Sequence, residues 1–121
     1  GVGIGGVLEP VGARPVIIED DVFVGARSEI AEGVVVRERA VISMGIFIGA
    51  STKIFDARKE SFGKIYIGEV PPSSVIIAGN LKKDIKDNDK LLGSTYTYAP
   101  IIVKTRDNKT DAKTSLNDIL R

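Results

Sequence analysis

Aliphatic residues recur at every sixth position through the first half of the chain. The seven positions of this register are all Ile or Val: Ile18, Val24, Ile30, Val36, Ile42, Ile48 and Ile54. A second register follows each of the first six by four residues and holds mostly small or β-branched side chains: Val22, Ser28, Val34, Ala40, Ile46 and Thr52. A period of six suits neither an α-helix nor an ordinary alternating strand. It predicts short strands separated by turns.

Three such strands would complete one triangular coil, with one aliphatic side chain of each strand pointing to a shared axis. Residues eighteen apart then stack at the inter-strand spacing of about 4.8 Å. The predicted ladders are Ile18–Val36–Ile54, Val24–Ile42 and Ile30–Ile48. A β-sandwich is the alternative, but its strands usually recur at about 8–12 residues. We therefore predict an all-β solenoid, a parallel β-helix of hexapeptide repeats.

The repeat is interrupted twice within the predicted solenoid. Residues 8–15 contain two prolines and a glycine, which mark a loop leaving the coil, either functional or a plain surface bulge. Residues 56–64 are polar and turn-forming between two aliphatic segments, which predicts a hairpin excursion. Residues 70–80 then read as the last coil.

The rest of the chain lacks the six-residue period. Residues 82–93 are charged and predicted to be loop, residues 98–103 form a strand candidate outside the coil, and residues 114–121 suit a short capped helix. We divide the chain into a β-helix domain, 1–81, and a C-terminal extension, 82–121. From Lys82 onward Lys and Arg outnumber Asp. This basic excess suits either a solvated face or an anionic ligand such as a nucleotide phosphate.

Composition narrows the chemistry. The chain has 121 residues, 43% hydrophobic and 27% charged, and a net charge of +1, which argues against nucleic acid as the main partner. It shows neither a signal peptide nor an apolar run long enough for a membrane span, so we expect a cytoplasmic protein. Cys and His are absent, so no metal site of the zinc type is expected. Because the repeat is already under way at Ile4-Gly5, we expect Gly1 to lie within a longer protein.

Hexapeptide repeats of this kind resemble the left-handed β-helix acyltransferases. The handedness rests on that resemblance alone, since parallel crossovers in ordinary sheets are right-handed. Most members of this superfamily use a His as general base, and this chain has none. A branch that uses a carboxylate base is compatible with the sequence.

Several longer strings make the resemblance closer. They include GVGIGGVLEP at 1–10, GARSE at 25–29 and VISMGIFIG at 41–49, with further matches at 75–81, 99–104 and 116–121. They resemble the 2,3,4,5-tetrahydropyridine-2,6-dicarboxylate N-succinyltransferase family over nearly the whole chain. The resemblance implies succinyl transfer from succinyl-CoA to the amine of ring-opened tetrahydrodipicolinate, in bacterial lysine and diaminopimelate synthesis. It also implies a homotrimer, with sites in clefts between neighbouring β-helices and no permanently bound cofactor.

The resemblance assigns a catalytic role to Glu29, the last residue of GARSE. An amine near neutral pH is mostly ammonium, and a nearby carboxylate can bind it and take its proton. The alternative for Glu29 is a solvated corner residue. Arg27 suits a substrate carboxylate, or equally a surface salt bridge. Ser28 and Glu9 complete the predicted substrate-binding set, Glu9 in a loop that closes over the cleft.

For the donor, Ser43, Met44 and Gly45 lie where family coils line the pantetheine arm of CoA, and Lys53 is placed to meet its phosphates. A second acidic residue and an Arg that contribute to the family's site fall before Gly1. Two further hypotheses stay open: another CoA-dependent acyltransferase of the same fold, and a non-catalytic β-helix trimerisation module.

Overall fold

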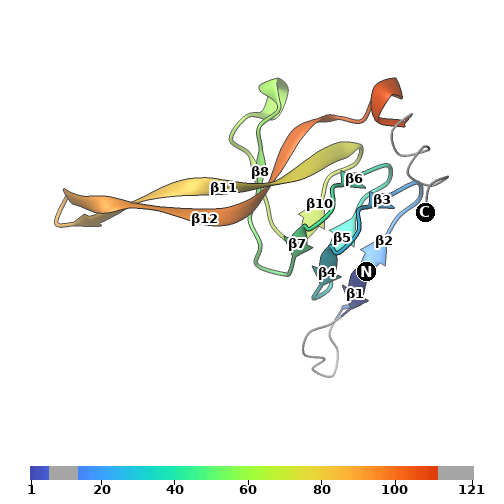
Figure 1. Ribbon diagram of the computed structural model, residues 1–121, viewed down its shortest axis with the longest axis horizontal. Helices are drawn as coiled ribbons and strands as arrows, with labels where there is room; N and C mark the ends of the chain where they lie inside the picture. The colour runs from blue at the N-terminus through green and yellow to red at the C-terminus, as the bar shows by residue number, and fades with distance from the viewer. Residues whose placement is uncertain (6–13, 112–121) are drawn as a thin grey trace.

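The chain winds into a triangular prism from which one long hairpin projects (Figure 1). The computed structural model describes residues 1–5 and 14–111. The strands of the coils are β1 (Gly3–Gly5), β2 (Ile17–Ile18), β3 (Phe23–Val24), β4 (Glu29–Ala31), β5 (Val35–Val36), β6 (Val41–Ile42), β7 (Phe47–Ile48) and β10 (Glu69–Val70). The excursion and the hairpin comprise β8 (Ile54–Asp56), the 3₁₀ turn η1 (Lys59–Ser61), β9 (Ile65–Tyr66), β11 (Ser74–Asp87) and β12 (Lys90–Thr105).

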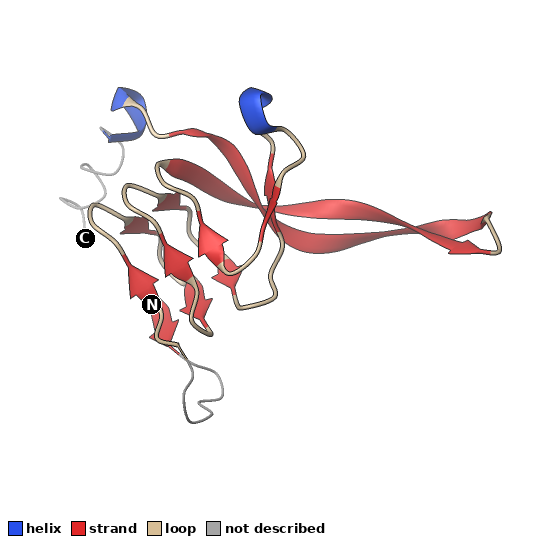
Figure 2. Cartoon of the chain, turned by 180° about the vertical axis from the view of Figure 1, so that it is seen from behind, coloured by secondary structure: helices blue, strands red, loops and turns tan. Residues whose placement is uncertain are grey.

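The prism has three faces, each a stack of parallel strands (Figure 2). The first face has the strand order β1-β4-β7, and the second has β10-β5-β2. The third face begins with β3-β6-β11 and continues through β12, β8 and β9. Successive strands of the chain therefore fall on successive faces, as the six-residue period predicts. The parallel β-helix is confirmed, while its left-handed winding stays a prediction of the family resemblance.

The predicted ladders form the core. Ile18 pairs with Val36, Val24 with Ile42, and Ile30 with Ile48, each eighteen residues apart. Among the inward positions of both registers, the following are at most 2% exposed: Ile30, Val34, Val36, Ala40, Ile42, Ile46, Ile48 and Ile54. Burial of one Ile or Val side chain is worth about 1.5–3 kcal/mol, so this row supplies the main stabilisation of the coils.

One ladder prediction is wrong. The neighbour of Val36 in the next coil is Val70, not Ile54. After β7 the chain leaves the coil through the predicted hairpin excursion, where β8 and β9 pair antiparallel, and it returns to the second face only at β10. Ile54 is still fully buried, but its strand pairs with β9 and β12.

The corners of the coils repeat with the same period as the core. Positive φ angles occur at Asp21 (58°), Arg27 (62°), Gly33 (72°), Arg39 (61°) and Gly45 (73°), each six residues after the last. Left-handed backbone costs a non-glycine residue roughly 1 kcal/mol or more. The stacking of the coils, and not the local preference of these residues, therefore sets the backbone conformation at the corners.

The prediction of a loop at residues 82–93 is wrong. β11 runs without a break from Ser74 to Asp87 and pairs antiparallel with β12, so the segment forms most of the projecting hairpin. The strand predicted at 98–103 is confirmed as part of β12. The predicted domain boundary at residue 81 falls inside β11. Charged side chains did not prevent strand formation, because most residues of this ribbon are exposed and satisfy their backbone against each other.

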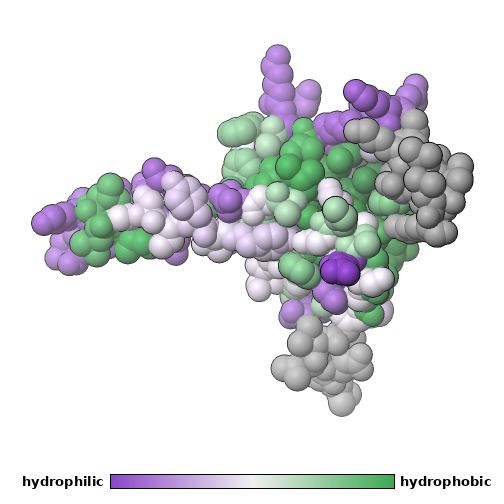
Figure 3. Space-filling view, in the orientation of Figure 1, coloured by the Kyte–Doolittle hydropathy of each residue, from purple (hydrophilic) through white to green (hydrophobic). Residues whose placement is uncertain are grey.

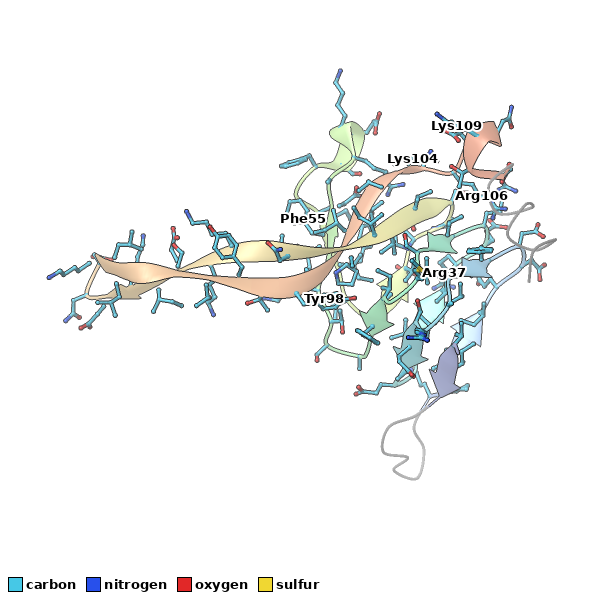
Figure 4. The ribbon with its side chains drawn as sticks, viewed as in Figure 1. Arg37, Phe55, Tyr98, Lys104, Arg106 and Lys109 are labelled. Carbon is cyan, nitrogen blue, oxygen red and sulfur yellow. The ribbon has the colours of Figure 1, made fainter. Side chains whose placement is uncertain are left out.

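Arg106 ties the end of the hairpin to three successive coils (Figure 4). Its amide donates to the carbonyl of Ser73 at 2.7 Å, and its Nη1 donates to the carbonyls of Asp21 at 2.6 Å and Arg39 at 3.3 Å. Its Nε donates to the carboxylate of Asp111. Asp21, Arg39 and Ser73 all have positive φ, so the guanidinium group and the backbone amide of Arg106 together join equivalent corners of the stack.

Several predictions lie outside the described residues. They are the loop at residues 8–13 with Glu9, and the helix at 114–121. The backbone is already helical at residues 108–111, where Asp107 accepts a hydrogen bond from the amide of Thr110 at 2.9 Å. An Asp in this position is a typical helix N-cap.

Two buried polar side chains hold neighbouring segments together. Ser28 is fully buried; its hydroxyl donates to the carbonyl of Ser43 at 2.9 Å and accepts from the amide of Ile46 at 3.1 Å. Asp56 is also fully buried and accepts hydrogen bonds from the guanidinium group of Arg58 and, at 2.7 Å, from the hydroxyl of Ser61. Burial alone would raise the pKa of Asp56, but these hydrogen bonds favour the carboxylate and hold its pKa below the ordinary value.

We expect Ser28→Ala to destabilise the protein by about 1–3 kcal/mol, because it leaves the buried amide of Ile46 without its acceptor. The matched control is Ser94→Ala, which removes an exposed hydrogen bond to Asp84 and should change the free energy of unfolding by less than about 0.5 kcal/mol. Urea unfolding monitored by circular dichroism measures both. Equal effects of the two substitutions would contradict the bridging role of Ser28.

Asp56 should make stability sensitive to acid. Because its folded pKa is depressed, its contribution is complete above the unfolded pKa of about 4 and is lost as the pH falls through the folded value. We expect Asp56→Asn to cost about 3 kcal/mol at pH 7, since it breaks a buried pair with Arg58. The cost should shrink towards pH 3, whereas the exposed Asp84→Asn should show neither effect. A cost of Asp56→Asn that stays constant from pH 7 to pH 3 would contradict this account.

Candidate functional site

Glu29 lies on the outer side of the first face. It is the first residue of β4 and is exposed, while the next residue, Ile30, points into the core. Its register partners are Gly3 in β1 and Phe47 in β7. A Cβ added to Gly3 would lie 1.9 Å from Glu29 Oε2, so the carboxylate rests directly on the backbone of Gly3. A side chain at residue 3 would displace it.

An aromatic pair borders Glu29 on the other side. Phe47 is 52% exposed, and its ring centroid lies 6.2 Å from that of Tyr98 in β12. The Tyr98 hydroxyl accepts a hydrogen bond from the Phe47 amide at 2.8 Å and donates to the Phe47 carbonyl at 3.4 Å. The base of the hairpin is thereby tied to β7, the strand beside Glu29.

Arg27 and Ser28 precede Glu29 in the chain and differ sharply in exposure. Arg27 occupies the corner before β4, is exposed, and lies against Gly1. Ser28 is fully buried, with its hydroxyl hydrogen-bonded to two neighbouring backbone groups. The surface therefore presents the guanidinium and the carboxylate, and the predicted substrate contact of Ser28 is not favoured by its position.

The turn at Ser43, Met44 and Gly45 stacks on the corner of the preceding coil. The Gly45 amide donates to the carbonyl of Ala26 at 3.0 Å, and the Ser43 amide donates to the carbonyl of Ile76 at 3.0 Å. These two amides therefore bond to neighbouring coils and are not open to a ligand such as the pantetheine arm. The Met44 side chain is 74% exposed and projects from the turn.

Lys53 lines a pocket of about 630 Å³ between the coil and the base of the hairpin. The pocket is bordered by residues 51–53 after β7, 81–83 in β11 and 97–99 in β12. Its lining contains three lysines, Lys53, Lys82 and Lys83, and also Tyr98. The sequence does not single out Lys82 and Lys83 as site residues, because their charged surroundings predict a loop at residues 82–93. The basic excess from Lys82 onward was the signal that pointed to them.

The structure brings together only some of the predicted residues. Glu29 is central on the first face, the Ser43–Gly45 turn leads into β7, and Lys53 follows β7. Tyr98 touches both Phe47, beside Glu29, and the lysine pocket. An aromatic connection thus lies between the candidate base and the cationic pocket.

A second charged cluster, on the second face, serves the fold. Arg37 pairs with Glu69 at 2.6 Å and with Glu19 at 3.2 Å (Figure 4). Its hydrogen bonds to Glu69 and then to Glu19 raise the pKa of Arg37 further above its usual value. Because both carboxylates belong to neighbouring coils, this cluster links strands β2, β5 and β10 and is not part of the candidate site.

Within 1–5 and 14–111, no group of three or more His, Cys, Asp or Glu side chains is placed to hold a metal ion. In that part of the chain no helix has the length and apolar character needed to cross a bilayer.

Comparison with known proteins supports the resemblance noted in the sequence. Residues 15–50 match the family described as "Hexapeptide repeat of succinyl-transferase". Over the whole chain, 55% of residues are identical to the 2,3,4,5-tetrahydropyridine-2,6-dicarboxylate N-succinyltransferase of Afipia carboxidovorans, of which the chain covers 41%. The identity is 56% with the protein of that name from Cupriavidus taiwanensis and 57% with that from Wolbachia pipientis, each covered to 40%.

The chain thus spans about two fifths of the length of the curated relatives that it matches. Its own residues are aligned from end to end, and the hexapeptide match falls on the strands that build the prism. Over its whole length the chain is thus homologous to part of the proteins named 2,3,4,5-tetrahydropyridine-2,6-dicarboxylate N-succinyltransferase.

Proposed function

We propose that the protein transfers a succinyl group from succinyl-CoA to the amino group of ring-opened tetrahydrodipicolinate. Support comes from the names of the relatives, which match over the whole chain at 55–57% identity. The observation that carries the proposal in the structure is Glu29, an exposed carboxylate fixed between Gly3 and Phe47 on an ordered face of the prism. The reaction takes place in lysine and diaminopimelate synthesis, and we propose that it occurs in the cytoplasm.

In this proposal Glu29 acts on the amine. The substrate ammonium binds beside the carboxylate, gives up a proton to it, and attacks the thioester carbonyl as the free amine. The new N–C bond forms, the C–S bond breaks, and the thiolate of CoA leaves and takes up the second proton that the amine nitrogen loses as the amide forms. Arg27, exposed at the corner before β4, is placed to pair with a carboxylate of the substrate.

The lysine pocket suits the other end of the donor. CoA carries its negative charge on phosphates, and the lysines Lys53, Lys82 and Lys83 are among the residues that line one pocket. Ammonium groups bind phosphate as point charges without strict geometry. We assign the phosphates to this pocket and the pantetheine arm to the exposed side of the first face. Met44 provides apolar contact there, and no cofactor is retained between turnovers.

Glu29→Gln in the natural, full-length protein should lower kcat/KM by two to four orders of magnitude, because a general base is lost while size and shape are kept. The dissociation constant of CoA should change less than about threefold, since Glu29 acts on the amine. Initial rates with succinyl-CoA and isothermal titration with CoA measure the two quantities.

Glu32→Gln is the matched control, because Glu32 is also exposed and lies at the next corner of the same coil. It should leave kcat/KM within about twofold. Wild-type kcat/KM in Glu29→Gln would rule out this base. A clear preference of the wild type for acetyl-CoA would favour another acyltransferase of the same fold.

We also propose that the protein assembles as a homotrimer, with each site in a cleft between neighbouring prisms. The exposed apolar side chains of Met44 and Phe47, close to Glu29 on the coil, support a covered first face. Sedimentation velocity of the natural protein at micromolar concentration should give the mass of three chains. A stable monomer that still transfers succinyl would contradict the assembly and leave the chemical proposal intact.

A further inference from the structure

Tyr98 occupies the junction between the two parts of the candidate site. Its hydroxyl hydrogen-bonds to the amide and carbonyl of Phe47, the register partner of Glu29. Its ring also lines the lysine pocket at the base of the hairpin. Tyr98 therefore contacts the strand beside the carboxylate and also lines the cationic pocket. It lies at the base of the hairpin, next to the coils (Figure 4).

The hairpin pairs with other strands at only a few positions, so an additional contact at its base restricts its orientation. β11 pairs with the coil at Val75 and Ile76, and β12 pairs with β8 at Ile101 and Ile102. Beyond these positions the two strands pair with each other and extend as a ribbon, whose outer part exposes apolar as well as charged side chains (Figure 3). A two-stranded ribbon is marginally stable and bends readily.

Two of the pocket lysines lie on this ribbon, beyond its last pairing with the coil. Tyr98 pairs with Asn80, and Lys82 and Lys83 follow directly in β11. The position of these ammonium groups relative to Glu29 thus depends on how the ribbon is fixed to β7. The two hydrogen bonds from Tyr98 to the Phe47 backbone supply that fixation next to the pocket.

We propose that Tyr98 is a positioning residue that sets the separation between the phosphate-binding pocket and the Glu29 carboxylate. The inference rests on the proposed function. A donor anchored by its phosphates in the pocket then presents its thioester at Glu29 in a fixed place. Binding energy from a remote part of a substrate can in this way be used at the reacting carbon. A misplacement of about 1 Å can cost about 100-fold in rate.

Tyr98→Phe tests the proposal, because it keeps the ring against Phe47 and removes the hydroxyl. The natural, full-length protein is assayed with two donors, succinyl-CoA and the succinyl thioester of N-acetylcysteamine, which lacks the phosphates. With succinyl-CoA we expect kcat to fall about 10- to 100-fold and KM to change less than about threefold. With the truncated donor, kcat/KM should stay within about twofold, since nothing anchors it in the pocket.

Tyr96→Phe is the matched control. Tyr96 lies two residues away in the same strand, is 67% exposed, and should leave both donors unaffected. A further variant, Lys82→Ala with Lys83→Ala, should raise KM for succinyl-CoA. In that background Tyr98→Phe should have less than about a threefold effect, because the anchor is already lost.

The outcomes separate the inference from the proposed function. Equal losses with both donors, or no loss with either, would overturn the positioning role of Tyr98 and leave the role of Glu29 untouched. Full retention of the Tyr98→Phe effect after removal of the two lysines would also overturn it. If the wild type transferred succinyl from neither donor, the proposed function would fall. If Glu29→Gln had no effect, Glu29 would not be the base. In either case the inference would fall as well.

Discussion

The exclusion of the inward-facing Ile and Val side chains from water is the constraint on which the structure depends. Each coil is too short to bury its aliphatic residues by itself, so Val24 is covered by Ile42 and Ile30 by Ile48 of the next coil. This stacking fixes the register of every strand on the three faces. It also fixes which residues point outward, and so it gives Glu29 a defined place between Gly3 and Phe47. The candidate site is a consequence of the packing beneath it.

Polar interactions act where the chain departs from the simple repeat. Ser28 bridges two coils from inside the prism, and Asp56 closes the excursion through Arg58 and Ser61. Arg106 crosses three corners and fixes the chain that follows the hairpin. All three groups are hydrogen-bonded, as buried polar groups must be if they are not to cost stability. These hydrogen bonds therefore tie irregular segments of the chain to the coils.

The hairpin gives the protein a second surface that the coils cannot provide. The coils present flat faces with a few charged side chains, whereas the base of the hairpin encloses a pocket against residues 51–53. Its lysines come from positions far apart in the chain, Lys53 on one side and Lys82 and Lys83 on the other. Lys82 also lies 3.9 Å from a carboxylate oxygen of Asp84, which balances part of this positive charge. The pocket is therefore built jointly by the coil and the hairpin.

The coils could be predicted from the sequence alone. Each short strand buries one aliphatic side chain, and these side chains therefore recur at every sixth position. The sequence also singled out Glu29 and Lys53, through the GARSE string and the family resemblance, and it marked the excursion after Ile54 by a polar run. Tertiary structure alone decided that Val70 covers Val36, since the length of an excursion does not reveal which face the chain rejoins.

The stacking of the coils also sets the left-handed backbone conformation of Arg27 and Arg39 at two corners. Nothing in the local preference of arginine indicates this conformation. Residues 82–93 read as loop because they are charged and form no apolar pattern. They become strand by pairing with a distant partner, and backbone pairing between two exposed strands leaves no period in the side chains. For the same physical reason, the contact of Tyr98 with Phe47 and the pocket around Lys53 became visible only in the folded chain.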